Sequence, residues 1–187
     1  MLTSVLAMES GFIVAFILLL LPLLVIAIMY NGLVNRRNQV RYAFSSIDVQ
    51  LKKRFDLIPS LVETVKGYAA HESQLLESVV LARQQLTQHS TWSGEEMLSS
   101  HVAQLMVRVE AYPQLKADGQ FLFLQRSLSE CEEQIAAARR VYNSSVMDYH
   151  NAIHMFPSSI IASLFSFREM PSFEVAVEER RNPSVRF

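Results

Sequence analysis

The sequence predicts an all-α protein, in which an N-terminal transmembrane helix is followed by an elongated antiparallel up-and-down four-helix bundle of long helices. Residues 11–30 form an uncharged apolar run, and later stretches repeat apolar residues about every 3.5 positions. The chain also has only five Gly and six Pro. An all-β sandwich of many short strands needs more turn residues than that.

The overall composition narrows the class of protein further. Hydrophobic residues make up 50% of the 187 residues and charged residues 19%, which excludes a disordered or collagen-like chain. Lys and Arg together number 17 against 18 for Asp and Glu, so we expect no nucleic-acid partner. The single cysteine, Cys131, excludes an internal disulfide framework and a zinc site with four cysteine ligands.

The run from Gly11 to Tyr30 predicts the membrane-spanning helix, and residues 1–10 a short extracytoplasmic N-terminus. A helix over 11–30 rises about 30 Å, which is the thickness of a hydrocarbon core. A buried core helix is rarely apolar all round over this length. A cleaved secretory signal is disfavoured, because the first ten residues carry no Lys or Arg. Pro22 would kink the helix, which membrane helices tolerate.

Basic residues follow the span, whereas Glu9 is the only charged residue before it. The positive-inside rule therefore predicts an outside N-terminus and a cytoplasmic location for the rest of the chain. The basic residues are Arg36, Arg37, Arg41, Lys52, Lys53 and Arg54. They either serve only as a topology signal or also hold the chain against anionic headgroups. We expect an upright helix, in which a rise of about 1.5 Å per residue carries the last three too far from the membrane to feel it. These three are then free to pair with carboxylates.

Residues 31–167 are predicted to form the helical bundle. In its first stretch, apolar residues recur at steps of four and three from Val40 to Leu86. Arg54 occupies one position of this stripe, where it either snorkels or pairs with a carboxylate of another helix. Asp56 is a candidate N-cap for a helix that kinks or restarts at Pro59.

A second helical stretch is predicted over residues 98–112. Ser93 and Glu96 precede it in the spacing of a capping box. Pro113 is expected to end this helix. A link over 114–119 is then short enough to join antiparallel neighbours.

The third stretch has the most regular spacing, with apolar or small residues at strict 4–3 steps over 124–156. It predicts one long helix that ends before Pro157. Cys131 falls on this stripe, so we interpret it as a small buried apolar side chain and not as a nucleophile.

The chain changes in character after Pro157. A short helix carries a one-sided apolar patch made of Ile160, Ile161, Leu164 and Phe165. This patch either caps the open end of the bundle or docks a partner or second protomer, and we favour the cap. Residues 168–187 form a predicted C-terminal tail that ends on Phe187, and its role stays open.

Few residues suggest chemistry. His150 and His154 stand at i, i+4 as metal-binding pairs do, but a site needs further ligands, so a solvated or interfacial pair is the better interpretation. The sequence contains no Gly-rich phosphate loop, no H-E-x-x-H motif and no nucleophile elbow. We therefore expect no enzymatic activity and no cofactor.

Several segments resemble the LemA family of bacterial membrane proteins. The resemblance runs from YNGLVNRRNQV through IDVQLKKRFDLIPSLVETVKGYAAHE, and it is most specific at Asp56 to Pro59. It continues through VEAYPQLKA, FLFLQ, ARRVYN and MFPSSIIASLF to a P-x-V-x-F ending at 183–187. His150 departs from the family, whose members commonly carry Asn there. The resemblance implies a single N-terminal transmembrane helix in the bacterial inner membrane, an outside N-terminus and a cytoplasmic four-helix bundle.

These observations favour a non-enzymatic, membrane-anchored scaffold whose partners are the lipid bilayer and other copies of itself. The resemblance adds that family members look similar to a magnetosome-membrane protein, which suggests a role in organising membrane. It also associates the family with an inner-membrane zinc metalloprotease. The alternative function is therefore an accessory subunit of such a protease in quality control or stress signalling. The candidate interaction residues are Arg36, Arg37, Arg41, Lys52, Lys53, Arg54, Asp56, Pro59, Ile160, Ile161, Leu164, Phe165 and Phe187.

Overall fold

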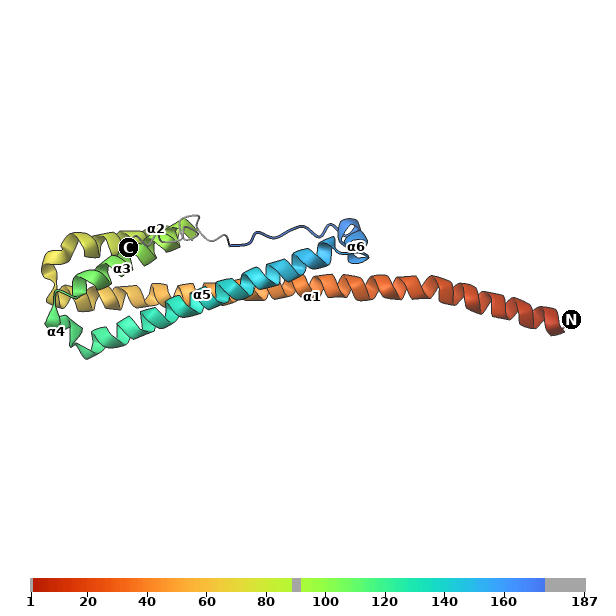
Figure 1. Ribbon diagram of the computed structural model, residues 1–187, viewed down its shortest axis with the longest axis horizontal. Coiled ribbons are helices and arrows are strands. Elements are labelled where there is room, and N and C mark those ends of the chain that lie inside the picture. The colour runs from red at the N-terminus through yellow and green to blue at the C-terminus, as the bar shows by residue number, and fades with distance from the viewer. Residues whose placement is uncertain (1, 89–91, 174–187) are drawn as a thin grey trace, which may run out of the picture. The chain divides into compact units, whose positions relative to one another are not determined.

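The computed structural model describes residues 2–88 and 92–173, and their regular secondary structure is helical throughout, with no strand in these two ranges. The predicted all-α class is confirmed over these residues. The elements are α1 (Leu2–Tyr68), a 3₁₀ turn η1 (Ala70–Glu72), α2 (Ser73–Gln88), α3 (Trp92–Val109), α4 (Pro113–Lys116), α5 (Gly119–His154) and α6 (Ser158–Leu164) (Figure 1).

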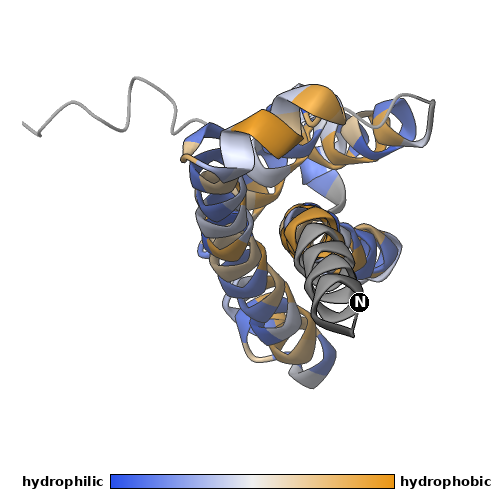
Figure 2. Cartoon of the chain, turned by 90° about the vertical axis from the view of Figure 1, so that its right-hand side faces the viewer, coloured by the Kyte–Doolittle hydropathy of each residue, from blue (hydrophilic) through white to orange (hydrophobic). Residues whose placement is uncertain are grey.

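The apolar run lies in α1 and is not covered by other parts of the chain. Its large apolar side chains from Leu18 to Ile28 are 39–73% exposed, which a core helix of a soluble domain would not tolerate. The same section of α1 is orange where it follows the grey residues in Figure 2. Among the described residues, α1 is the one helix long and apolar enough to cross a membrane. It therefore fits a membrane anchor.

Pro59 lies inside α1, which continues unbroken to Tyr68. Of the two outcomes predicted at this proline, the restart of the helix is wrong and Asp56 is not an N-cap, whereas the kink stays a prediction. A proline inside a helix removes the N–H that would bind the carbonyl four residues earlier, here that of Phe55. That carbonyl instead accepts a hydrogen bond from Nε of Arg83 in α2, at 3.3 Å, and the Arg83 guanidinium lies 4.0 Å from the Phe55 ring centroid. The tertiary contact replaces the missing helical bond.

The chain divides into two compact units. Unit 1 consists of residues 1–45 and 138–187, and unit 2 of residues 46–137. Each unit therefore takes a part of α1 and a part of α5. This division leaves the predicted boundaries at 30/31 and 167/168 as predictions, and the single four-helix bundle also stays a prediction.

The core of unit 2 is formed by side chains from α1 to α5 and from Ala69, which precedes η1. The buried residues are Ile58, Leu61, Val65, Ala69, Leu76, Val79, Ala82, Leu86, Leu98, Val102, Leu105, Val109, Leu115, Phe121, Leu124 and Leu128. Most lie on the predicted stripes. The stripe expected to run without a break to Leu86 is interrupted at η1. After this turn Leu76 is buried, whereas Leu75, the predicted stripe position, is only partly buried. Pro113 opens α4 and does not end α3, because the first turn of a helix needs no N–H from it.

The buried face of α5 departs from the predicted stripe in its second half. Val146 and Ile153 are buried, where the strict 4–3 steps placed Ser145 and Ala152. A straight α-helix has 3.6 residues per turn, so its buried face drifts by about 20° per heptad from a 3.5-residue repeat. Tyr142 and Tyr149 are buried as predicted, and the coiled-coil interpretation of this half of α5 stays a prediction.

Candidate functional site

Unit 1 contains a segment that we call the strap, residues 166–173, which follows α6 and returns along α5 (Figure 1). The reversal occurs at Ser166, whose φ is 55°. The Phe167 N–H donates to the Ala162 carbonyl (2.9 Å), and the Ser166 N–H donates to the Ser163 carbonyl (3.3 Å). This pair of bonds is the Schellman motif, which satisfies the last carbonyls of a helix through a left-handed residue.

Side chains of α5 bind the backbone of the strap. The Asn143 amide makes two bonds to Phe173: its Nδ2 donates to the carbonyl (2.9 Å) and its Oδ1 accepts the N–H (2.8 Å). Nε2 of His150 accepts the Met170 N–H at 3.1 Å. These contacts replace the backbone partners that an extended segment lacks when no sheet is present. The strap is therefore docked by side chains of one helix.

Two tyrosines of α5 complete the docking. The Tyr149 hydroxyl donates to the Arg168 carbonyl (2.9 Å), and the Tyr142 hydroxyl donates to the Pro171 carbonyl (2.7 Å). Burial raises the pKa of both tyrosines above the ordinary value of 10.0. Both hydroxyls therefore keep their protons at neutral pH and act as donors.

The two histidines of the predicted pair each contact a different residue of the strap. His154 Nε2 lies 2.8 Å from Glu169 Oε1, while His150 accepts the Met170 N–H. Among the described residues, no group of three or more His, Cys, Asp or Glu side chains is arranged to hold a metal ion. The two histidines thus hold the strap.

Aromatic side chains join the two ends of unit 1. The Tyr30 ring lies 4.8 Å from the Phe165 ring and 5.7 Å from the Phe167 ring, measured between centroids. The Arg37 guanidinium stands 5.2 Å from the centroid of Phe167, a cation–π geometry. Arg36 donates to the Asp148 carbonyl at 3.4 Å. The last residue of the apolar run is thereby packed against the end of α6.

Unit 2 holds a buried ion cluster around Arg54, which is 2% exposed. Its guanidinium donates to the carboxylate of Glu95, to Oε1 of Glu132 (2.8 Å) and to the hydroxyl of Ser99. Of the two alternatives for this arginine, the structure shows the pairing with other helices. The cluster joins α1, α3 and α5 through paired charges, while Nε of Arg54 is buried without a hydrogen-bond partner.

The predicted interaction residues fall into both units. Lys52 pairs with Asp56 at 3.3 Å within α1, and Lys53 pairs with Glu130 of α5 at 3.5 Å. Pro59 is exposed on α1. Of the six basic candidates, Lys52, Lys53 and Arg54 therefore have carboxylate partners inside unit 2. The other three, Arg36, Arg37 and Arg41, belong to unit 1.

The predicted apolar patch is split by the packing of α6. Ile161 is buried together with Ala162, whereas Ile160 and Leu164 are exposed, and Phe165 is half-exposed against Tyr30. Ile161 is thus packed inward, and the interpretation of the patch as a cap on the bundle stays a prediction. Phe187 lies outside the described residues.

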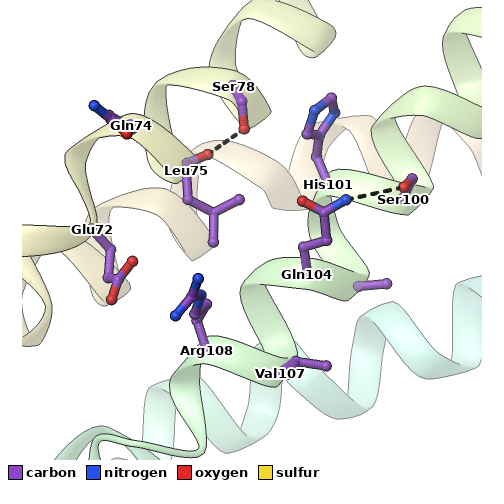
Figure 3. Close-up of a pocket in the computed structure, with 10 residues that line it drawn as sticks. Glu72, Gln74, Leu75, Ser78, Ser100, His101, Gln104, Val107 and Arg108 are labelled. Atoms are coloured by element: carbon purple, nitrogen blue, oxygen red, sulfur yellow. Dashed lines mark hydrogen bonds between the residues drawn. The ribbon is translucent and has the colours of Figure 1, made fainter.

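One depression in unit 2 lies between α2 and α3 and has a volume of about 820 Å³ (Figure 3). Glu72 and Arg108 line one side of it, and His101 and Ser100 the other. Among the described residues, Nδ1 of His101 is buried without a hydrogen-bond partner. The arrangement does not form a recognisable catalytic constellation.

Comparison with known proteins places the chain in a family. The family model described as the LemA family matches residues 43–187. The chain belongs to the LemA family. Protein LemA of Metamycoplasma hominis is 24% identical over 177 residues, which cover 88% of this chain and 81% of that protein. The magnetosome protein MamQ of Magnetospirillum gryphiswaldense is 24% identical over 174 residues, covering 77% of this chain and 64% of that protein.

In this LemA family chain, sequence reasoning missed the strap and its anchor residues. Tyr142 and Tyr149 were predicted only as core positions, and Asn143 was not singled out. One signal was available: Asn143 and His150 are seven residues apart, which places them on one face of α5 beside the buried stripe. Polar side chains next to a packed stripe indicate that another segment docks there.

Proposed function

We propose that this LemA family member is a non-enzymatic scaffold held on the bacterial inner membrane by its N-terminal helix. The observation that carries the proposal is the continuity of α1, which extends from the exposed apolar run into the cores of both units. A folded chain joined to its anchor by an unbroken helix has no flexible linker there, so its helices are presented at the membrane. In this proposal the N-terminus lies outside and the helical units lie in the cytoplasm.

The polar clusters support a scaffold over an enzyme. The Arg54 cluster and the strap contacts occupy their polar groups with partners inside the chain. Catalytic groups, in contrast, need perturbed and accessible side chains arranged around an open site. In this proposal the helices contributed by unit 2 pack as an antiparallel bundle, and their outer faces bind further copies of the chain.

Exposed apolar side chains on α3 and α5 support self-association. Val107 on α3 is 73% exposed and Phe123 on α5 is 66% exposed, whereas Val109, two residues further along α3, is buried. Large exposed apolar side chains of this kind are common at contacts between proteins. The names of the relatives, one of which is a magnetosome protein, are consistent with a location at a membrane.

Site-specific photocrosslinking in native membranes tests the proposal. A photoreactive amino acid replaces Val107 in the full chain, and a second variant carries it at the buried Val109 as the matched control. We expect adducts of twice the chain mass from position 107 and none from position 109. Adducts of position 107 only with a membrane metalloprotease would favour the accessory-subunit function. A chain that remains monomeric and is washed from membranes by salt would contradict the scaffold.

A further inference from the structure

The segment from Met155 to Phe167 contains no charged side chain, although it lies at the surface of unit 1. It comprises the turn after α5, all of α6 and the first two residues beyond its C-cap. Phe156 is 82% exposed, Leu164 70% and Ile160 58%. Large apolar side chains gathered in one uncharged segment mark an interaction surface far more often than single exposed ones do.

The inner face of α6 is already packed, so its outer face is the one left open. Ile161 and Ala162 are buried, while Ile160 and Leu164 stand at i, i+4 on the opposite side. The Schellman motif fixes the end of the helix through the Phe167–Ala162 bond. The exposed side chains are therefore held outward by a folded helix and do not belong to a frayed chain end.

The position of α6 in unit 1 indicates which surface its outer face meets. Phe165 and Phe167 pack on Tyr30, the residue that ends the apolar run of α1. Tyrosine at that position is typical of the boundary between hydrocarbon and headgroups. Arg36 lies six residues further along α1, about 9 Å of helix, where a guanidinium meets headgroup phosphates.

We propose that Met155, Phe156 and the outer face of α6 form a lipid-docking surface that enters the bilayer interface beside the exit of α1. The proposal rests on the membrane anchoring in the proposed function, and it adds a second, interfacial contact to the spanning helix. Apolar faces of this kind settle about 5–10 Å into the boundary between headgroups and acyl chains. The occupant is the phospholipid bilayer itself, and Ser158, Ser159 and Ser163 supply hydroxyls suited to that polar layer.

Continuity with the spanning helix favours lipid over a second copy of the chain. Because Tyr30 and α6 are in contact, anchoring α1 brings α6 to the membrane without a separate encounter, so even a weak apolar face is held there. A second copy would carry the same patch at the same level, and the collision measurement below distinguishes such a copy from lipid. The packing of Phe165 on Tyr30 thus commits this surface to the bilayer.

Depth measurement by electron paramagnetic resonance tests the docking surface in the full chain, reconstituted in nanodiscs of phosphatidylethanolamine and phosphatidylglycerol. Nitroxide labels are placed at Ile160→Cys or Leu164→Cys in a Cys131→Ala background. Val141→Cys is the matched control, since Val141 lies in unit 1, is apolar and is 58% exposed, as Ile160 is. Molecular oxygen concentrates in lipid and a nickel chelate in water, so the ratio of their collision rates reports depth.

We expect oxygen to dominate at positions 160 and 164, with a ratio several-fold above that at position 141. A ratio equal to that at position 141 would overturn the proposal, because the face would then be in water. Protection from both reagents at position 160 would also overturn it, since a protein would then cover the surface. A label at Leu21→Cys separates the two claims: it reports lipid whenever the anchor is correct, and its failure alone removes the proposed function.

Discussion

Replacing Arg54 by methionine tests the buried ion cluster of unit 2. The methionine side chain fills the space of the apolar part of Arg54 but lacks the charge that binds Glu95. The Glu95 side chain is only 10% exposed. A buried carboxylate left without its partner costs about 3–5 kcal/mol. The contact with Glu132 adds little, because that side chain is 47% exposed and solvent screens it. We therefore expect Arg54→Met to destabilise unit 2 by about 3–5 kcal/mol, a large share of the ~5–15 kcal/mol typical of a domain.

The assay is thiol labelling of Cys131 in the full chain in nanodiscs under increasing denaturant. Cys131 is fully buried in unit 2 and burial raises its thiol pKa above 9.0, so labelling reports opening of this unit. Lys52→Met is the matched control, since its pair with Asp56 is exposed and within one helix. Such pairs contribute about 0.3–0.5 kcal/mol. The double variant Arg54→Met, Glu95→Leu should recover most of the loss, because apolar groups replace a buried pair at little cost.

The result that would refute this reasoning is a small effect. If Arg54→Met cost less than about 1 kcal/mol and matched Lys52→Met, the cluster would be solvated in solution and would not join the helices. A double variant no more stable than Arg54→Met alone would show that the loss comes from packing of the arginine stem and not from the stranded carboxylate.

Three further predictions concern the strap and a helix cap. Asn143→Ala removes both hydrogen bonds to Phe173, each of which contributes about 0.5–1.5 kcal/mol. Hydrogen exchange of the Phe173 amide should therefore accelerate roughly 5- to 150-fold. An unchanged exchange rate would show that the strap is not docked. Ser166→Gly relieves a side chain at φ 55° and should stabilise unit 1 by about 1 kcal/mol in denaturant unfolding, and a destabilised variant would contradict the turn. Asp118 accepts the Phe121 N–H at 2.8 Å as the N-cap of α5, and this bond lowers its pKa below 3.8. Because the folded-state pKa is the lower one, this stabilisation is complete above pH 3.8 and is lost as the pH falls through the folded value. Asp118→Asn keeps the cap and should remove that acid dependence from unfolding curves.

Hydrophobic spacing predicted the cores well because burial follows the helical period directly. Leu98, Val102 and Leu105 are buried as the 4–3 steps indicated. The same rule placed Ser145 where Val146 is buried, because steps of three and four can follow each other in either order and spacing alone does not fix which comes first. Local spacing thus specifies which face is buried over a few turns but not over ten.

Contacts between residues distant in sequence were beyond this reasoning. The unbroken helix at Pro59 depends on Arg83, which supplies a donor to the Phe55 carbonyl from another helix. Docking of the strap depends on Asn143 meeting a backbone 30 residues away. Neither contact leaves a periodic signal, since each joins one side chain to one carbonyl or amide. The buried position of Arg54 could be expected from the stripe, but its partners could not.

Topology labelling with an impermeant maleimide tests whether α1 anchors the helical units on the cytoplasmic side of the membrane. Two variants of the full chain are compared in intact spheroplasts in a Cys131→Ala background: Ser4→Cys before the apolar run, and Met97→Cys on α3, where Met97 is exposed. We expect position 4 to react at once and position 97 to react only after the membrane is permeabilised. Reaction at position 97 in intact spheroplasts, with position 4 protected, would contradict this expectation.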